Sequence, residues 1–244
     1  MRTDLHALLL SNSTIPGEGF LAWAVEDLKR FLGDRKKIAF VPYAAVGFSY
    51  DEYFSKVDQV LGALGHTCLA VHADKEPVRL LGEADVIAVG GGNTFQLLKL
   101  LYKFDLVRAI RKQVRGGASY VGWSAGSNVA CPTIMTTNDM PVAEPPSFMG
   151  LQLVGYQINP HYTEATIPGH GGESRDQRIT EFLELHPDIP VAGLYEGSLL
   201  LHEQGRISLR GKGLKRFAHG TPPVTILGGQ ELGPDLSPTT ASQG

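Results

Sequence analysis

A serine with a glycine two positions away on each side is the feature of this chain that points most directly to chemistry. Gly122, Ser124 and Gly126 form this pattern. A short apolar run precedes Ser124 and a run compatible with a helix follows it, which predicts a strand, a sharp turn and a helix. Such a turn exposes the serine Oγ, and glycine lets the two backbone arms approach closely. The pattern predicts a serine nucleophile, with a flexible glycine turn as the plainer alternative.

A serine nucleophile needs a general base, and two of the eight histidines are candidates. His161 follows a short apolar run, where a strand is expected to end, whereas His170 lies in the glycine-rich segment 169–172. The other histidines lie within or beside expected elements or near the C-terminal end of the chain. We favour His161, with a histidine that caps a turn as the structural alternative.

A carboxylate should orient this base. Asp139 lies in the long segment directly after the expected nucleophile helix, and Glu196 lies at an expected turn between strands. A glutamate before a glycine also has an ordinary structural explanation at such a turn. Spacing along the chain does not choose between the two carboxylates, so both are candidates.

A run of three glycines at 90–92 follows another expected strand. Backbone N–H groups reach a developing oxyanion only where no side chain intervenes, so Gly91 and Gly92 are expected to form an oxyanion hole with the N–H of Ala125. A phosphate-binding loop is the alternative. However, no Lys-Ser or Lys-Thr pair follows, and the spacing matches no dinucleotide-binding pattern.

Two arginines, Arg175 and Arg178, lie near the start of the helix expected at 174–185. Positive charges there oppose the helix dipole, and Ser174 is the expected N-cap. The default explanation is a solvated first turn. An arginine so placed can instead bind a ligand carboxylate through its planar guanidinium.

Composition bounds the class of protein. The 244 residues are 43% hydrophobic and 19% charged, which suits one α/β domain with a large core. We expect this domain over 1–227 and a flexible tail, rich in Gly, Pro, Ser and Thr, over 228–244. The formal net charge of −3 favours neither a nucleic acid nor an anionic membrane as partner.

Cysteine usage suits a reducing compartment, because Cys68 and Cys131 are too few for a disulfide framework. The sequence predicts no signal peptide and no membrane span, so we expect a cytoplasmic protein. The isolated cysteines and the spacing of His161 and His170 predict no metal site, and no cofactor is expected. A homodimer is compatible with this composition, which leaves the oligomeric state open.

Strand and helix patterns alternate along the chain. Strands are expected at 5–11, 37–43, 67–71, 84–89 and 118–121, then at 190–194, 198–202 and 206–209; helices are expected at 20–32, 50–64, 95–102, 106–113 and 174–185. This order predicts an α/β fold with a mostly parallel sheet flanked by helices on both faces. Ligands of such sheets bind at the carboxyl ends of the strands, where the glycine run and Ser124 both lie.

Four motifs together resemble the peptidase E family of aspartyl dipeptidases. They are residues 89–94, 122–127, 136–141 and 159–162, and the resemblance extends from the strand near residue 8 to about residue 217. It implies a fold similar to class I glutamine amidotransferase domains (flavodoxin-like), with serine in place of cysteine at the nucleophile. It also implies hydrolysis of dipeptides that begin with aspartate.

The resemblance further implies the roles of the triad. Ser124 would be the nucleophile and His161 the general base. Asp139 and Glu196 both look like positions proposed for the third member in this family. We prefer Asp139 and keep Glu196 as the rival.

Substrate recognition is also implied by the resemblance. Arg175 would pair with the side-chain carboxylate of the substrate aspartate, which gives a reason for its position at a helix start. Asn93 and Asn138, which lie in two of the motifs, would contact the same small peptide substrate.

Two other function classes stay open. An esterase of the α/β-hydrolase fold would also carry a serine between glycines, but that fold normally places more strands between nucleophile and acid than the spacing from Ser124 to Asp139 allows. A non-catalytic binding protein of the amidotransferase-like fold would keep the cleft without turnover. Activity on aryl esters, or tight binding unaffected by Ser124→Ala, would distinguish these classes.

Overall fold

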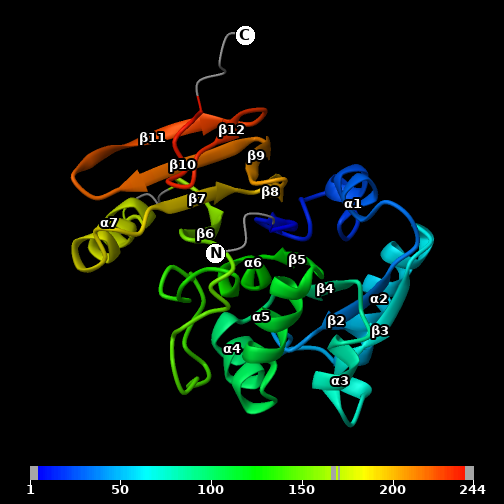
Figure 1. The fold of residues 1–244 in the computed structure, drawn as a ribbon. Coiled ribbons are helices and arrows are strands. Elements are labelled where there is room, and N and C mark those ends of the chain that lie inside the picture. Colours follow the sequence, from blue (N-terminus) through cyan, green and yellow to red (C-terminus); the bar gives the residue numbers. More distant parts are fainter. Residues whose placement is uncertain (1–4, 166–168, 170, 240–244) are drawn as a thin grey trace.

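The central element of the fold is an eight-stranded mixed sheet with the strand order β12-β9-β8-β1-β5-β4-β2-β3 (Figure 1). The computed structural model describes residues 5–165, 169 and 171–239. The parallel strands are β1 (Ala7–Leu10), β2 (Lys37–Val41), β3 (Thr67–Ala70), β4 (Val86–Val89) and β5 (Ser119–Trp123). The antiparallel strands β8 (Ser198–Glu203), β9 (Arg206–Gly211) and β12 (Glu231–Leu232) extend the sheet beyond β1.

Helices cover both faces of this sheet, because side chains along each strand alternate between two buried clusters. On β1, Leu9 packs into one cluster, whereas Leu8 and Leu10 pack into the other. The helices are α1 (Val25–Leu32), α2 (Tyr50–Ala63), α3 (Pro77–Leu81), α4 (Thr94–Lys103), α5 (Leu106–Gly116) and α6 (Ala125–Val129), with short 3₁₀ turns at Ala22–Ala24 and Val71–Ala73. The predicted α/β class, with helices on both faces of a largely parallel sheet, is confirmed.

A second, four-stranded sheet was not expected from the sequence. Its order is β11-β10-β7-β6, and its strands are β6 (Gln157–Tyr162), β7 (Val191–Tyr195), β10 (Gly213–Ala218) and β11 (Thr221–Leu227). Helix α7 (Arg175–Leu185) lies beside this sheet (Figure 1). Ile179, Phe182 and Leu183 of the helix pack against Val191 and Phe217 of the sheet.

The C-terminal segment differs from its prediction as a flexible tail over 228–244. Residues 231–232 form β12 and pair with β9, and Leu236 is fully buried in the main core. The glycines and prolines that suggested disorder instead form turns, such as the one at Gly233. Residues 240–244 lie outside the described part of the chain.

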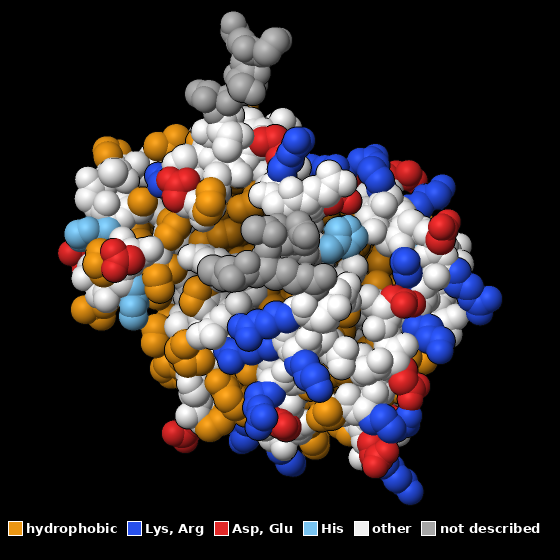
Figure 2. Space-filling model, in the orientation of Figure 1, with side chains coloured by type: hydrophobic (Ala, Val, Ile, Leu, Met, Phe, Trp, Pro, Cys, Tyr) orange, Lys and Arg blue, Asp and Glu red, His pale blue; other side chains and the backbone are white. Residues whose placement is uncertain are grey.

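Acidic and basic side chains are interspersed over the face of the molecule shown in Figure 2. Exposed apolar side chains gather in the long segment between α6 and β6, including Met140, Val142 and Phe148. Among the described residues, no helix is both long and apolar enough to cross a membrane.

A buried histidine on β8 makes the stability of the fold depend on pH. His202 Nε2 lies 2.6 Å from the Tyr156 hydroxyl, and the two rings are stacked. Burial lowers the pKa of His202 from 6.5 to about 4. Between these two values the unfolded chain binds a proton that the folded chain does not bind.

We therefore expect the free energy of unfolding to fall as the pH drops below 6.5. The contribution of His202 is fully present above that value and is lost as the pH falls toward the folded pKa of about 4. Each pKa unit corresponds to about 1.4 kcal/mol, so the loss between pH 7 and pH 4.5 is about 2–3 kcal/mol. Urea titrations of the wild type and His202→Gln at pH 7 and pH 4.5 measure this pH-dependent contribution to the free energy of unfolding. An equal pH dependence in the two proteins would contradict it.

Candidate active site

Ser124 occupies a strained turn between β5 and α6. Its backbone angles are φ 53° and ψ −114°, which are uncommon for a residue with a side chain. A Cβ atom at Gly126 would lie 2.0 Å from the carbonyl oxygen of Val89, and one at Gly122 would lie 2.5 Å from that of Gly126. Both glycines are therefore required by close backbone approach, as the sequence predicts for a nucleophile elbow.

Hydrogen bonds to carbonyl oxygens of the main sheet fix the position of this turn. The N–H of Ser124 donates to the carbonyl oxygen of Leu10 at 3.1 Å. The Ser127 hydroxyl is buried 2.7 Å from the same oxygen and 2.8 Å from the carbonyl oxygen of Gly122. The start of α6 is thus tied to β1 and β5, and strain of this kind persists only where surrounding structure holds it.

His161 lies on β6 with its ring beside Ser124. Its Nε2 is 2.9 Å from Ser124 Oγ, and its Nδ1 is 2.7 Å from an oxygen of Glu196. The backbone of His161 also has a positive φ of 52°, at the point where the pairing of β6 with β7 shifts register. Its N–H donates to Ser11 Oγ at 2.9 Å, so the side chain of Ser11, directly after β1, fixes the backbone that carries the ring.

The structure places Glu196, not Asp139, against His161, which corrects our preference for Asp139 as the orienting carboxylate. Asp139 Oδ2 instead accepts hydrogen bonds from the Thr94 N–H at 2.8 Å, the Thr94 hydroxyl at 2.6 Å and the Thr137 hydroxyl at 3.1 Å. The N-terminus of α4 thus engages the carboxylate that the sequence assigned to the histidine. The rival base, His170, lies outside the described residues.

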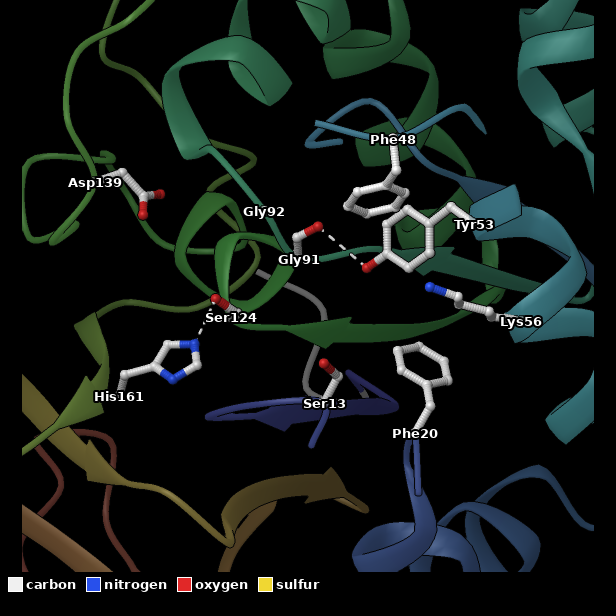
Figure 3. Close-up of a pocket in the computed structure, with 10 residues that line it drawn as sticks. All are labelled: Ser13, Phe20, Phe48, Tyr53, Lys56, Gly91, Gly92, Ser124, Asp139 and His161. Carbon is white, nitrogen blue, oxygen red and sulfur yellow. Dashed lines mark hydrogen bonds between the residues drawn. The ribbon is translucent and has the colours of Figure 1, made fainter. Parts of the chain in front are cut away.

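The glycine loop after β4 presents one peptide plane in a fixed orientation. The Tyr53 hydroxyl donates to the carbonyl oxygen of Gly91 at 3.1 Å and accepts from Trp123 Nε1–H at 2.8 Å. Figure 3 shows the Gly91 carbonyl oxygen directed at the Tyr53 hydroxyl. Because a trans peptide directs its C=O and N–H to opposite sides, the Gly92 N–H of the same peptide points away from Tyr53. Gly92 has φ 134°, and a Cβ there would lie 2.3 Å from the carbonyl oxygen of Ala44.

Gly91 and Gly92 of this loop and Ser124 of the elbow line one cavity of about 400 Å³. Within the described ranges, no acceptor pairs with the N–H groups of Gly91, Gly92 or Ala125. The cavity is lined by Ser13, Phe20, Phe48, Tyr53, Lys56, Gly91, Gly92, Ser124, Asp139 and His161. Figure 3 shows Ser124, His161 and Asp139 toward one end and the aromatic rings with Lys56 toward the other.

The side chains of Asn93 and Asn138, both predicted to bind substrate, are hydrogen-bonded within the protein. Asn93 accepts from the Gln96 N–H at 3.0 Å as the N-cap of α4, and it donates to the Met140 carbonyl at 2.8 Å. Asn138 donates to the Pro160 carbonyl at 2.8 Å and accepts from Asn159 at 2.9 Å. Both asparagines hold the segment between α6 and β6 in place.

Arg175 is the first residue of α7 and is half-buried. Its Nη1 lies 3.5 Å from Asn159 Oδ1 and from the Pro160 carbonyl oxygen, directly before His161 in the chain. Burial lowers the pKa of the Arg175 guanidinium and the charge of Arg178 adds to this, whereas Glu196 acts in the opposite direction. No described carboxylate lies within ion-pair distance of Arg175, which leaves its charge available to a ligand.

No sequence pattern predicted the far wall of the cavity. Phe20, Phe48, Tyr53 and Lys56 belong to segments distant from the motifs, and an aromatic residue at helical spacing on α2 is ordinarily core. The packing of Tyr53 on Phe40 and Trp123 brings α2, with Lys56, to the site. Phe20 packs edge-on against Tyr53 and Trp123 from another segment. Across the described part of the chain, no three His, Cys, Asp or Glu side chains are grouped closely enough to hold a metal ion.

Comparison with known proteins agrees with this arrangement. Residues 7–210 match the profile of Peptidase family S51. Peptidase E of Nostoc sp. is 52% identical over 205 residues, which cover 84% of this chain and 85% of that protein. Peptidase E of Shewanella denitrificans is 43% identical over 229 residues, covering 93% and 97% of the two chains.

The fold is also similar to that of a solved relative. A peptidase from an acI-B1 Actinobacterium superposes with a TM-score of 0.70 at 19% identity, over 94% of this chain and 96% of the other. At this identity the likeness concerns the fold, and the sequence relatives carry the assignment. The chain belongs to peptidase family S51, and it is a serine-type dipeptidase.

Proposed function

We propose that the enzyme hydrolyses dipeptides with an N-terminal aspartate and that Ser124, His161 and Glu196 form its catalytic triad. The observation that carries the triad is the pair of contacts on either side of one imidazole: 2.9 Å from Nε2 to Ser124 Oγ and 2.7 Å from Nδ1 to Glu196. A nucleophile, a base and an orienting carboxylate in this order are what acyl transfer from a serine requires.

The reaction proceeds through an acyl-enzyme. His161 takes the Ser124 proton while Oγ bonds to the carbonyl carbon of the substrate aspartate. The peptide C–N bond then breaks, and His161 delivers the proton to the leaving amine. A water molecule, deprotonated by the same imidazole, cleaves the ester, which releases aspartate and restores the Ser124 hydroxyl.

The oxyanion formed in each half-reaction is stabilised by backbone N–H groups. The Gly92 N–H is directed away from Tyr53. Among the described residues, no acceptor pairs with the N–H groups of Gly92, Ala125 or Gly91. A fixed donor of this type contributes about 2.7–4 kcal/mol to transition-state stabilisation. Gly92 and Ala125 are the principal pair, since Ala125 directly follows Ser124 and Gly92 lines the same cavity as Ser124.

Arg175 provides the selectivity for aspartate. Its half-buried guanidinium has only weak contacts, at 3.5 Å, with neutral oxygens of Asn159 and Pro160. A neutral substrate side chain would leave this charge without a strong partner, whereas an aspartate carboxylate would bind it in a bidentate manner. Sites built for a polar group reject analogues that lack it.

Release of free leucine from Asp-Leu, measured beside Asn-Leu and Leu-Asp with Ser124→Ala as blank, tests the proposed function. Cleavage of Asp-Leu alone, lost in the variant, supports it. Cleavage of aryl esters but not of Asp-Leu would favour an esterase. Tight binding of Asp-Leu without turnover would favour a binding protein of the same fold.

Glu196→Gln tests the third member of the triad. The amide preserves the shape of the side chain but not its charge, so the imidazolium formed during attack loses its electrostatic partner. We expect kcat to fall by about 10²- to 10⁴-fold, and the partly exposed position of Glu196, 42% accessible, favours the lower end. Steady-state kinetics on Asp-Leu measures this, and a variant within threefold of wild type would contradict the assignment.

We also propose that the enzyme acts in the cytoplasm on small peptides, as one domain that extends through β12 and without a nucleic acid or membrane partner. Two free cysteines, Cys68 and Cys131, suit a reducing compartment, and a net charge of −3 does not favour binding to polyanions. Size-exclusion chromatography with light scattering decides between a monomer and a homodimer.

A further inference from the structure

Asp139 lines the active-site cavity but does not orient His161. It supplies the only carboxylate among the described cavity-lining residues, and Figure 3 shows it on the same side of the cavity as Ser124 and His161. A carboxylate at a helix N-terminus can be purely structural. The arrangement of its two oxygens, however, indicates a second use.

One oxygen of Asp139 is fully engaged and the other is not. Oδ2 accepts from the Thr94 N–H, the Thr94 hydroxyl and the Thr137 hydroxyl, at 2.8, 2.6 and 3.1 Å. No described residue donates to Oδ1. Three donors on one oxygen fix the rotation of the carboxylate about its side-chain bond, which leaves the second oxygen as a rigid acceptor in the cavity.

A hydrogen-bonded network also connects Asp139 to the residue that selects the aspartate side chain. The preceding residue, Asn138, accepts from Asn159 at 2.9 Å, and Asn159 Oδ1 lies 3.5 Å from Arg175 Nη1. The segments that carry Asp139 and Arg175 are therefore both connected to Asn159, two residues before His161. The substrate aspartate has two charges next to its scissile carbonyl, a side-chain carboxylate and an α-ammonium group.

We propose that Asp139 Oδ1 accepts a charge-assisted hydrogen bond from the α-ammonium group of the substrate, which makes Asp139 the determinant of exopeptidase action. This inference rests on the proposed function, in which Arg175 binds the other charge of the same residue. A substrate extended at its N-terminus has an uncharged amide in place of the ammonium group. It would then leave a carboxylate in the cavity without its partner.

Two matched substrates and one isosteric variant test this inference. Asp-Leu and succinyl-leucine have the same two carboxylates and the same scissile bond, and they differ only in the α-ammonium group. Asp139→Asn keeps a carbonyl oxygen that can accept from Thr94 and Thr137, but it removes the charge. The measured quantity is the ratio of kcat/KM for Asp-Leu to kcat/KM for succinyl-leucine.

We expect wild-type enzyme to prefer Asp-Leu by about 10- to 100-fold, the range for a hydrogen bond to a charged group. In Asp139→Asn this ratio should fall to within about threefold of one, mainly through a higher KM for Asp-Leu. Thr137→Val is the matched control, because it disturbs the same hydrogen-bonded loop and keeps the charge, so its ratio should stay high. If Asp139→Asn does not fold, Asp139→Glu, which displaces the charge by one methylene, should give an intermediate ratio.

The pH dependence gives an independent readout. The α-amine of a peptide titrates near pH 8, so the ratio for wild type should decline above this pH, whereas that of Asp139→Asn should be flat. His161, Glu196 and Lys56 face or adjoin the cavity in the complex with either substrate, so the ratio removes their common contribution.

The outcomes separate this inference from the proposed function. If wild type cleaves Asp-Leu and the ratio persists in Asp139→Asn, or if both substrates lose equally, Asp139 is only structural and the inference is wrong. If wild type cleaves neither substrate, the proposed function is wrong and the inference falls with it. Loss confined to Asp-Leu supports both.

Discussion

Ser124→Ala is expected to lower kcat on Asp-Leu by about 10⁴- to 10⁶-fold, the range seen when a nucleophile that acts as a unit with its base is removed. Without Oγ no acyl-enzyme forms, and only the oxyanion donors and substrate binding remain. The backbone at Ser124 has φ 53°, which alanine tolerates no better than serine, but the hydroxyl makes no contact other than that with His161 among the described residues. We therefore expect the fold and the melting temperature to change little.

The control is Ser208→Ala on β9. Ser208 donates to Glu231 on β12, far along the chain from the cavity-lining residues. It should keep full activity. Leucine release from Asp-Leu, followed with both variants and checked by circular dichroism, gives the comparison. If folded Ser124→Ala protein, free of contaminating wild-type enzyme, kept more than about 1% of the wild-type turnover of Asp-Leu, Ser124 would be excluded as the nucleophile.

Arg175→Ala is expected to lower kcat/KM for Asp-Leu by about 10²- to 10⁴-fold, since a half-buried ion pair with the substrate is lost and its carboxylate is left desolvated. Hydrolysis of Asn-Leu, which never had this ion pair, should change by less than about tenfold. The preference for aspartate over asparagine therefore collapses in the variant, and paired kinetics on the two dipeptides measure this collapse.

Arg178→Ala is the matched control for Arg175. Both arginines lie in the first turns of α7, but the Arg178 side chain is 67% exposed and lies 3.9 Å from Glu173. Its removal changes the charge of the helix start equally without removing a candidate ligand. An unchanged preference for aspartate in Arg175→Ala would show that Arg175 does not select the substrate side chain. Equal losses in the two variants would show that Arg175 acts only through the general charge of the helix start.

Most elements near the elbow could be predicted from the sequence, because their apolar periodicity is strong. Helix α2 was expected at 50–64 and spans Tyr50–Ala63, and β3 was expected at 67–71 and spans Thr67–Ala70. Strands β10 and β11 were missed. β11 is almost entirely exposed and contains Pro222 and Pro223, so it lacks both the alternation and the composition by which strands are predicted.

The carboxylate partner of His161 could not be chosen from the sequence for a related reason. Its position depends on the parallel pairing of β6 with β7, which sets Tyr195 opposite Tyr162 and so brings Glu196 to the imidazole. Pairing between strands separated by a helix leaves no trace in local spacing. Asp139 lies closer than Glu196 to Ser124 along the chain, but in the folded protein its carboxylate accepts from the first residue of α4.

The Tyr53 hydroxyl links the rate of the reaction to the integrity of the core. It bonds to Gly91 on one side and to Trp123, the residue before Ser124, on the other. The peptide dipole that we propose for the oxyanion hole is consequently oriented when α2 docks during folding, so little reorganisation energy is needed when charge develops. The donor needs no induced fit by substrate, and any condition that loosens α2 from the sheet would impair turnover before the protein unfolds.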